Sequence, residues 1–243
     1  MSNQYSSIEN ESIEGSDLLA ELAGEATQKN KVLQSEEQYR QERSQNLHAA
    51  LNKIFQYFSQ FSSHLNKIKP TTPRGYNVDP RTAYSNIQWG EVRIDSRKQS
   101  LSDKALIDHV SMLVKLTATK PVLTKRRWNE LDSLSKELSD LGLRPIEDLN
   151  VQARRQPQQE IFELELAPDF QMRIQFQGNY DTGKIDLLSN NFDGFGLAAH
   201  VLDPADVNQK LLDEIGRFLI GRNNSLPEIM SRTRFKPQYA IYR

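Results

Sequence analysis

The amino-acid sequence predicts an α+β protein. A disordered arm and a heptad-patterned helix come first, and a mixed region follows in which an antiparallel β-meander is packed by a C-terminal helix. Three observations predict this class. Apolar residues recur every three or four positions between Leu47 and Ile68, which is helical spacing. Later segments alternate between apolar and polar residues, as half-buried strands do. These strands follow one another without intervening helices.

Residues 1–30 are expected to form a disordered acidic arm, because they are polar and contain few large apolar side chains. Ser16 or Asp17 can cap a short helix in this arm, which either docks in a partner's groove or forms only transiently. That helix shows three leucines on one side: Leu18, Leu19 and Leu22. The first 25 residues contain no Lys or Arg and hold six acidic side chains: Glu9, Glu11, Glu14, Asp17, Glu21 and Glu25.

Residues 31–69 are predicted to form an amphipathic, coiled-coil-like helix. Pro70 ends it, because proline has no backbone N–H and restricts the residue before it. We term its apolar residues the heptad stripe: Leu47, Leu51, Ile54, Phe58, Phe61, Leu65 and Ile68. The neighbouring positions lack the charges that specify a parallel zipper. The stripe therefore drives self-association or a small bundle, docks on the chain's own globular part, or binds another protein.

The segment 70–82 is rich in proline and is expected to be a linker. Residues 83–150 are predicted to hold a β-hairpin plus a helix. Thr124 is expected to cap this helix at its start. Gly142 stands where a left-handed residue commonly follows the last helical turn.

Residues 151–222 are predicted to form a four-stranded antiparallel meander plus a helix. The strands are expected at four places: 162–166, 170–176, 185–187 and 197–201. Asp203 and Pro204 are typical of a helix start, and Gly221 is expected to end that helix. The helix should lie across the apolar face of the meander. Residues 223–243 are interpreted as a basic tail.

The composition bounds the function. The chain has 243 residues, a formal net charge of −1 and no cysteine, which excludes disulfides, thiolate nucleophiles and Fe–S clusters bound by cysteine. Neither a signal peptide nor a run of about 18 uncharged apolar residues is present, so a cytoplasmic protein without a membrane partner is expected. The four histidines lack the spacing of a metal site. We expect no cofactor and no metal. The absence of a catalytic motif disfavours an enzyme but does not exclude one.

Several basic residues, some of them near aromatic ones, are candidate nucleic-acid contacts, because cations and stacked rings bind single strands. They are Arg126, Arg127, Arg154, Arg155, Arg232, Arg234 and Lys236. The alternative interpretation is ordinary solvated side chains. A net charge near zero gives no global attraction to nucleic acid.

The leading hypothesis is a non-enzymatic cytosolic scaffold or interaction protein. In this hypothesis the heptad helix drives assembly, and the α+β region binds a protein partner. A nucleic-acid-associated protein that uses the basic segments and the C-terminal tail is the alternative. An enzyme without a familiar motif comes third. No resemblance to a known family is evident in the sequence.

Overall fold

The computed structural model describes residues 17–102, 104–147 and 161–226. The chain divides into two compact units, Met1–Arg43 and Ser44–Arg243. The helix α1 (Asp17–Ile68) begins in the first unit and ends in the second. All other described elements, and therefore the sheet and its core, belong to the second unit.

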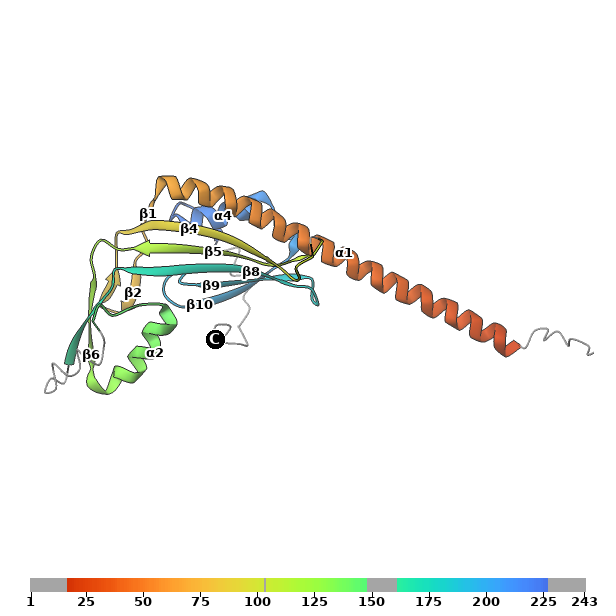
Figure 1. Cartoon of the computed structure of the whole chain (residues 1–243), viewed down its shortest axis with the longest axis horizontal. Coiled ribbons are helices and arrows are strands. Elements are labelled where there is room, and N and C mark those ends of the chain that lie inside the picture. Colours follow the sequence, from red (N-terminus) through yellow and green to blue (C-terminus); the bar gives the residue numbers. More distant parts are fainter. Residues whose placement is uncertain (1–16, 103, 148–160, 227–243) are drawn as a thin grey trace, which may run out of the picture. The chain divides into compact units, whose positions relative to one another are not determined.

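A six-stranded antiparallel sheet forms the centre of the second unit (Figure 1). In spatial order its strands are β1 (Thr71–Thr72), β4 (Ile87–Lys98), β5 (Ile107–Thr117), β8 (Asp169–Asn179), β9 (Lys184–Asn190) and β10 (Leu197–Leu202). Every neighbouring pair is antiparallel. The predicted α+β class is confirmed. So are the predicted hairpin, which is β4–β5, and the last three strands of the meander.

Two further strand pairs lie outside this sheet: β2 (Tyr76–Asp79) with β3 (Thr82–Tyr84), and β6 (Val122–Arg127) with β7 (Ile161–Leu166). The sequence predicts β7 as the first strand of the meander, but β7 pairs with β6 instead of β8. The prediction of a four-stranded meander is therefore wrong, because the two neighbours of β8 are β9 and β5. An alternating pattern locates a strand and its buried face but does not name its neighbour.

The expected linker at 70–82 is also wrong, because this segment contains β1, β2 and the start of β3. Tyr76 is buried, and its hydroxyl donates to the Asn191 carbonyl oxygen at 3.0 Å. The Arg74 guanidinium carbon lies 3.8 Å from the centroid of the Phe218 ring. Prolines here limit the length of each strand, but they leave the intervening side chains free to pack.

The helix α2 (Leu131–Leu141) follows a short 3₁₀ turn (Trp128–Glu130). The expected cap is wrong, because Thr124 lies in β6, is fully buried and donates its hydroxyl to the Asp79 carboxylate at 2.8 Å. The predicted helix end is confirmed. Gly142 adopts a φ of 68°, a left-handed conformation that glycine adopts without steric cost.

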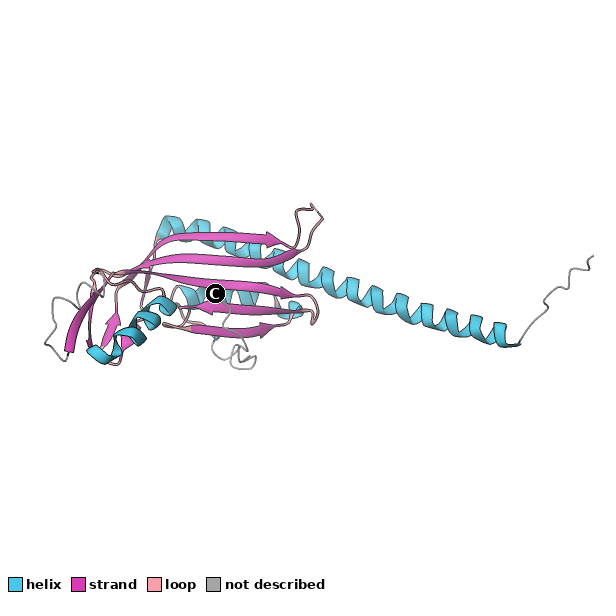
Figure 2. Ribbon diagram, turned by 60° about the horizontal axis from the view of Figure 1, so that its bottom comes forward, coloured by secondary structure: helices cyan, strands magenta, loops and turns pink. Residues whose placement is uncertain are grey.

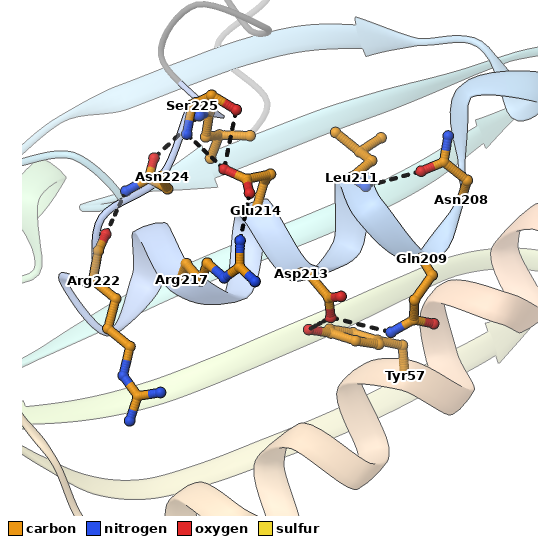
Figure 3. Close-up of polar contacts among 11 residues, drawn as sticks. Tyr57, Asn208, Gln209, Leu211, Asp213, Glu214, Arg217, Arg222, Asn224 and Ser225 are labelled. Atoms are coloured by element: carbon orange, nitrogen blue, oxygen red, sulfur yellow. Dashed lines mark hydrogen bonds and ion pairs between the residues drawn. The ribbon is translucent and has the colours of Figure 1, made fainter.

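The helix α4 (Gln209–Leu219) starts later than expected. Asp203 caps a separate 3₁₀ turn (Pro204–Asp206), and the side-chain oxygen of Asn208 caps α4 itself (Figure 3). Asp203 and Asn208 are both good capping residues and lie only a few positions apart. The sequence alone therefore could not decide which of them starts α4. Gly221, with a φ of 69°, follows the helix as predicted.

The second part of α1 and the helix α4 lie on one face of the sheet, here termed the inner face (Figure 1). Phe58 of α1 stacks on Phe176 of β8, with ring centroids 5.6 Å apart. Gly216 lets α4 approach α1 closely, because a Cβ at this position would lie 3.0 Å from the Tyr57 hydroxyl and 3.2 Å from the Phe61 ring. The sequence predicts the C-terminal helix on this face, and the structure places the second part of α1 on it as well.

The heptad stripe is packed within the single chain. Five of its members are buried, namely Leu47, Leu51, Ile54, Phe58 and Leu65, while Phe61 is half-buried and Ile68 is exposed. Of the three arrangements that the sequence leaves open, the structure contains the intramolecular one. Assembly of several chains through the stripe stays a prediction, and it requires a second chain to displace this packing.

The helix α1 begins at Asp17, which corrects the expected start near residue 31. Residues 17–43 are rich in strong helix formers, and two pairs of opposite charge, Glu25 with Lys29 and Glu36 with Arg40, stand one turn apart. Local propensity can therefore extend the helix without a buried face. The rest of the predicted arm (1–16) lies outside the described residues.

Candidate functional site

The face of the sheet opposite to α1 and α4 is here termed the outer face (Figure 2). It carries the polar residues that alternate with the core along β8. The strand register aligns the residues of the outer face, polar and apolar, in rows across five strands. One row contains Arg93, Leu113, Arg173, Asn190 and Leu197. The next contains Asp95, Ser111, Gln175, Leu188 and Ala199. Residues far apart in the sequence therefore share one surface.

The C-terminal end of α2 lies beside these rows and closes a groove of about 810 Å³, here termed the outer groove. The sheet contributes Arg93, Asp95, Gln171, Arg173 and Asn190 to its lining, and the end of α2 contributes residues 139–142. A second groove of about 630 Å³ shares Ser139, Gly142 and Gln171 with the first. Together they form a long depression along the end of α2, of a size that binding sites commonly have.

Asn191 holds the end of α2 against the sheet. Its side-chain amide donates to the carbonyl oxygens of Leu141 and Gln171, both at 2.8 Å, and its side-chain oxygen accepts from the Gly196 N–H at 3.1 Å. Asn191 is fully buried and has a φ of 57°. Sequence reasoning missed this residue. The only available signal is that asparagine tolerates a left-handed conformation better than most residues do. That property predicts a turn at Asn191, but it does not predict hydrogen bonds to the end of a distant helix.

The outer groove presents charges of both signs. Arg93 forms a bidentate pair with Glu91, at 2.7 and 2.8 Å, and Arg173 donates to the Gln175 side chain at 3.3 Å. Glu91 holds the pKa of the Arg93 guanidinium above its usual value. Two carboxylates, Asp95 and Asp140, lie in the same lining. The lining therefore offers strong donors and strong acceptors side by side.

Asn190 adds an acceptor that has no hydrogen-bond partner among the described residues. Its Oδ1 atom is buried, although the residue lines the outer groove. A buried polar atom without a partner destabilises the folded state by about 1–3 kcal/mol. A ligand that donates a hydrogen bond to this oxygen would remove that penalty.

The candidate nucleic-acid contacts do not gather into one described surface. Arg126 is largely buried and pairs with Asp79 at 3.0 Å. Burial raises the pKa of Asp79, but hydrogen bonds from Thr124, the Arg81 N–H and Arg126 outweigh it and lower the pKa to about 2.

Arg127 is exposed, but it follows Arg126 directly in β6, so the two side chains point to opposite faces of the strand. The other five candidates lie outside the described residues: Arg154, Arg155, Arg232, Arg234 and Lys236.

The described residues contain no cluster of three or more His, Asp or Glu side chains able to hold a metal ion. Among the described helices, none is long and apolar enough to cross a membrane. No protein-family model, curated protein or solved structure matches this chain.

Proposed function

We propose that this chain is a cytoplasmic, non-enzymatic interaction protein that binds an extended segment of a protein partner in the outer groove. The observation that carries the proposal is the row that aligns Arg93, Arg173 and Asn190 across the sheet beside the end of α2. The proposal assigns to the outer groove the partner binding that the sequence predicts for the α+β region. Assembly through the heptad stripe is not needed for this function.

A peptide segment suits the lining chemically. An extended main chain offers alternating N–H donors and C=O acceptors. The carboxylates of Asp95 and Asp140 and the oxygen of Asn190 can accept, while the guanidinium groups of Arg93 and Arg173 can donate. A lining of one sign would instead favour a small ion or a nucleic-acid backbone. Leu113 and Leu197 add apolar contacts in the same row.

The depression is also long enough for a chain segment. The second groove continues the first past Gly142 to Lys115, Arg144 and Asp169. At this end of the depression the Arg144 guanidinium pairs with the Asp169 carboxylate at 2.6 Å. A partner segment could therefore run beside the end of α2 in contact with both grooves.

The proposal is tested with a phage-displayed library of random peptides selected on the immobilised full chain. The affinities of enriched synthetic peptides for variants are then measured by isothermal titration calorimetry. We expect Arg93→Ala to weaken binding about tenfold, because a charge-assisted hydrogen bond is lost. Gln171→Ala should weaken it less.

Arg97→Ala is the matched control, because Arg97 is exposed on the same face of β4 but does not line the outer groove. Peptides that bind Arg93→Ala and Arg97→Ala equally well would place the site elsewhere. A library from which no peptide is enriched would reject peptide binding.

A further inference from the structure

The part of α1 that lies in the first unit, residues 17–43, presents one face on which charged and apolar side chains follow a regular order. At 3.6 residues per turn, six of its residues fall within about a third of the helix circumference. We term them the charged face: Glu25, Lys29, Val32, Leu33, Glu36 and Arg40. All six are exposed, so two apolar side chains stand accessible in the middle of a row of accessible charges.

The order of these charges is self-complementary. Along the charged face the side chains run negative, positive, apolar, negative and positive. A second copy that runs in the opposite direction sets Arg40 opposite Glu25 and Glu36 opposite Lys29. Both pairs have the same midpoint, which lies between the two apolar residues. A single antiparallel alignment therefore satisfies every charge of the face at once.

We propose that a second copy of this chain binds the charged face through its own charged face, antiparallel, about a two-fold axis between Val32 and Leu33. In this pairing each apolar side chain meets its own counterpart across the axis. A parallel pairing in register would instead set Glu25 against Glu25, and like charges repel. An unrelated partner would have to complement this face, but it gives no reason for the face to complement itself.

Each charge in the pair contacts two charges of opposite sign. Glu25 and Lys29 stand one turn apart in one copy, and Glu36 and Arg40 stand one turn apart in the other. The pairing joins Lys29 to Glu36 of the second copy and Glu25 to Arg40 of the second copy, which closes a ring of four alternating charges. The two-fold axis produces two such rings. A network of this kind stabilises an exposed interface better than isolated ion pairs do.

A hollow on one flank of the charged face has room for a large side chain of the second copy. It has a volume of about 650 Å³ and lies beside Gly24, where nothing lies within 4 Å of a Cβ position. Its lining is Glu21, Gly24, Glu25, Gln28, Lys29 and Val32. Tyr39 is 67% exposed and lies two turns from Val32 on the same flank. In the antiparallel pairing, Tyr39 of the second copy stands level with the middle of this hollow.

None of these contacts involves the outer groove or the heptad stripe. The inference is therefore independent of the proposed peptide site, and it leaves the heptad stripe packed within each chain. A two-fold axis closes the contact, so the pairing yields a dimer and leaves no second charged face open.

The test measures the molar mass of the full chain by sedimentation velocity over a concentration series. We expect a monomer–dimer equilibrium, with the charged face exposed at concentrations below the dissociation constant. Lys29→Glu should raise this constant at least about tenfold, because it sets like charges against Glu36 of the second copy.

Lys31→Glu is the matched control, since it makes the same change on the opposite side of the helix and should alter the dissociation constant less than about twofold. A wild-type chain that is monomeric at every concentration overturns the proposal. So does a dimer that the two variants weaken equally or leave unchanged.

Two double variants test whether the partner is a second copy bound through this face. Lys29→Glu with Arg40→Glu makes all four charges negative, and Glu25→Lys with Glu36→Lys makes all four positive. Neither variant should dimerise alone, whereas an equimolar mixture should form a heterodimer. A mixture that stays monomeric, while circular dichroism shows unchanged helix content in both variants, overturns the proposal. If a double variant loses helix, the comparison of Lys29→Glu with Lys31→Glu decides.

A spin label tests the direction of pairing, because the chain has no cysteine of its own. Ala20→Cys places one label on the exposed side of α1 away from the charged face. At 1.5 Å per residue, the antiparallel pair separates the two labels by about 37 Å along the helix axis, whereas a parallel pair in register places them at the same height. Double electron–electron resonance measures this distance. Labels at the same height would overturn the antiparallel pairing.

Discussion

The two parts of α1 differ in how they are stabilised, although they belong to one helix. In the part from Ser44 to Ile68, apolar residues recur at every helical turn, and five of the seven residues of the heptad stripe are buried. In the part from Asp17 to Arg43, all the large apolar residues are exposed by half or more: Leu18, Leu19, Leu22, Val32, Leu33 and Tyr39. Helix formation therefore does not require a buried face, whereas stable tertiary packing requires an apolar residue at each turn.

The largest expected effect comes from making the same substitution in both parts. Leu51→Ala should destabilise the fold by about 2–5 kcal/mol, because Leu51 is fully buried and its removal leaves a cavity. Leu33→Ala should change the free energy of unfolding by at most about 0.5 kcal/mol, because Leu33 is 52% exposed. Urea unfolding followed by circular dichroism measures both. Equal effects would mean that the first part also packs against something.

Two glycines sharpen the comparison. Gly178→Ala should destabilise the fold by about 1–3 kcal/mol, because the added Cβ would lie 2.9 Å from the Leu51 Cδ1 atom and 3.0 Å from the Tyr180 ring. Gly24→Ala should instead stabilise the first part of α1 by about 0.5–1 kcal/mol, since nothing lies within 4 Å and alanine favours helix. Thermal melting monitored at a helical wavelength separates the two outcomes. A stabilised Gly178→Ala would contradict the packing of Leu51 on β8.

A smaller effect is expected where α1 meets α4. The Tyr57 hydroxyl donates to the Asp213 carboxylate at 2.9 Å (Figure 3). Burial, together with this bond, raises the pKa of Tyr57 above its ordinary value. Tyr57→Phe should lower the free energy of unfolding by about 0.5–1.5 kcal/mol. Tyr39→Phe in the exposed part is the matched control, and a loss of similar size there would remove the distinction between the two parts.

The smallest effect is a pH dependence at Glu214, on the flank of α4 opposite to Tyr57 (Figure 3). The Ser225 N–H donates to this carboxylate and lowers its pKa, and this outweighs the opposing effect of desolvation. A lowered folded-state pKa means that the stabilisation is present above the ordinary value of 4.5 and is lost as the pH falls through the folded-state value.

Glu214→Gln should therefore narrow the difference in melting temperature between pH 7 and pH 3. Glu36→Gln in the exposed part serves as the control. An unchanged pH profile in Glu214→Gln would show that the contact with Ser225 does not stabilise the fold.

The sequence by itself determined the elements that depend on local chemistry. The alternation in β4, β5, β8, β9 and β10, the left-handed glycine after α2 and the apolar stripe of α1 were all predictable, because each follows from side-chain period or backbone sterics. The helical part of residues 17–30 was underestimated, since charge pairs one turn apart stabilise a helix that buries nothing.

Only the tertiary structure decided which elements meet. Pairing of β7 with β6, docking of the heptad stripe on Phe176, and the alignment of Arg93, Arg173 and Asn190 into a groove all join residues far apart in the sequence. An apolar period states that a face must be buried but not against what, because the hydrophobic effect has no direction. The candidate site is a product of strand order, which no single segment encodes.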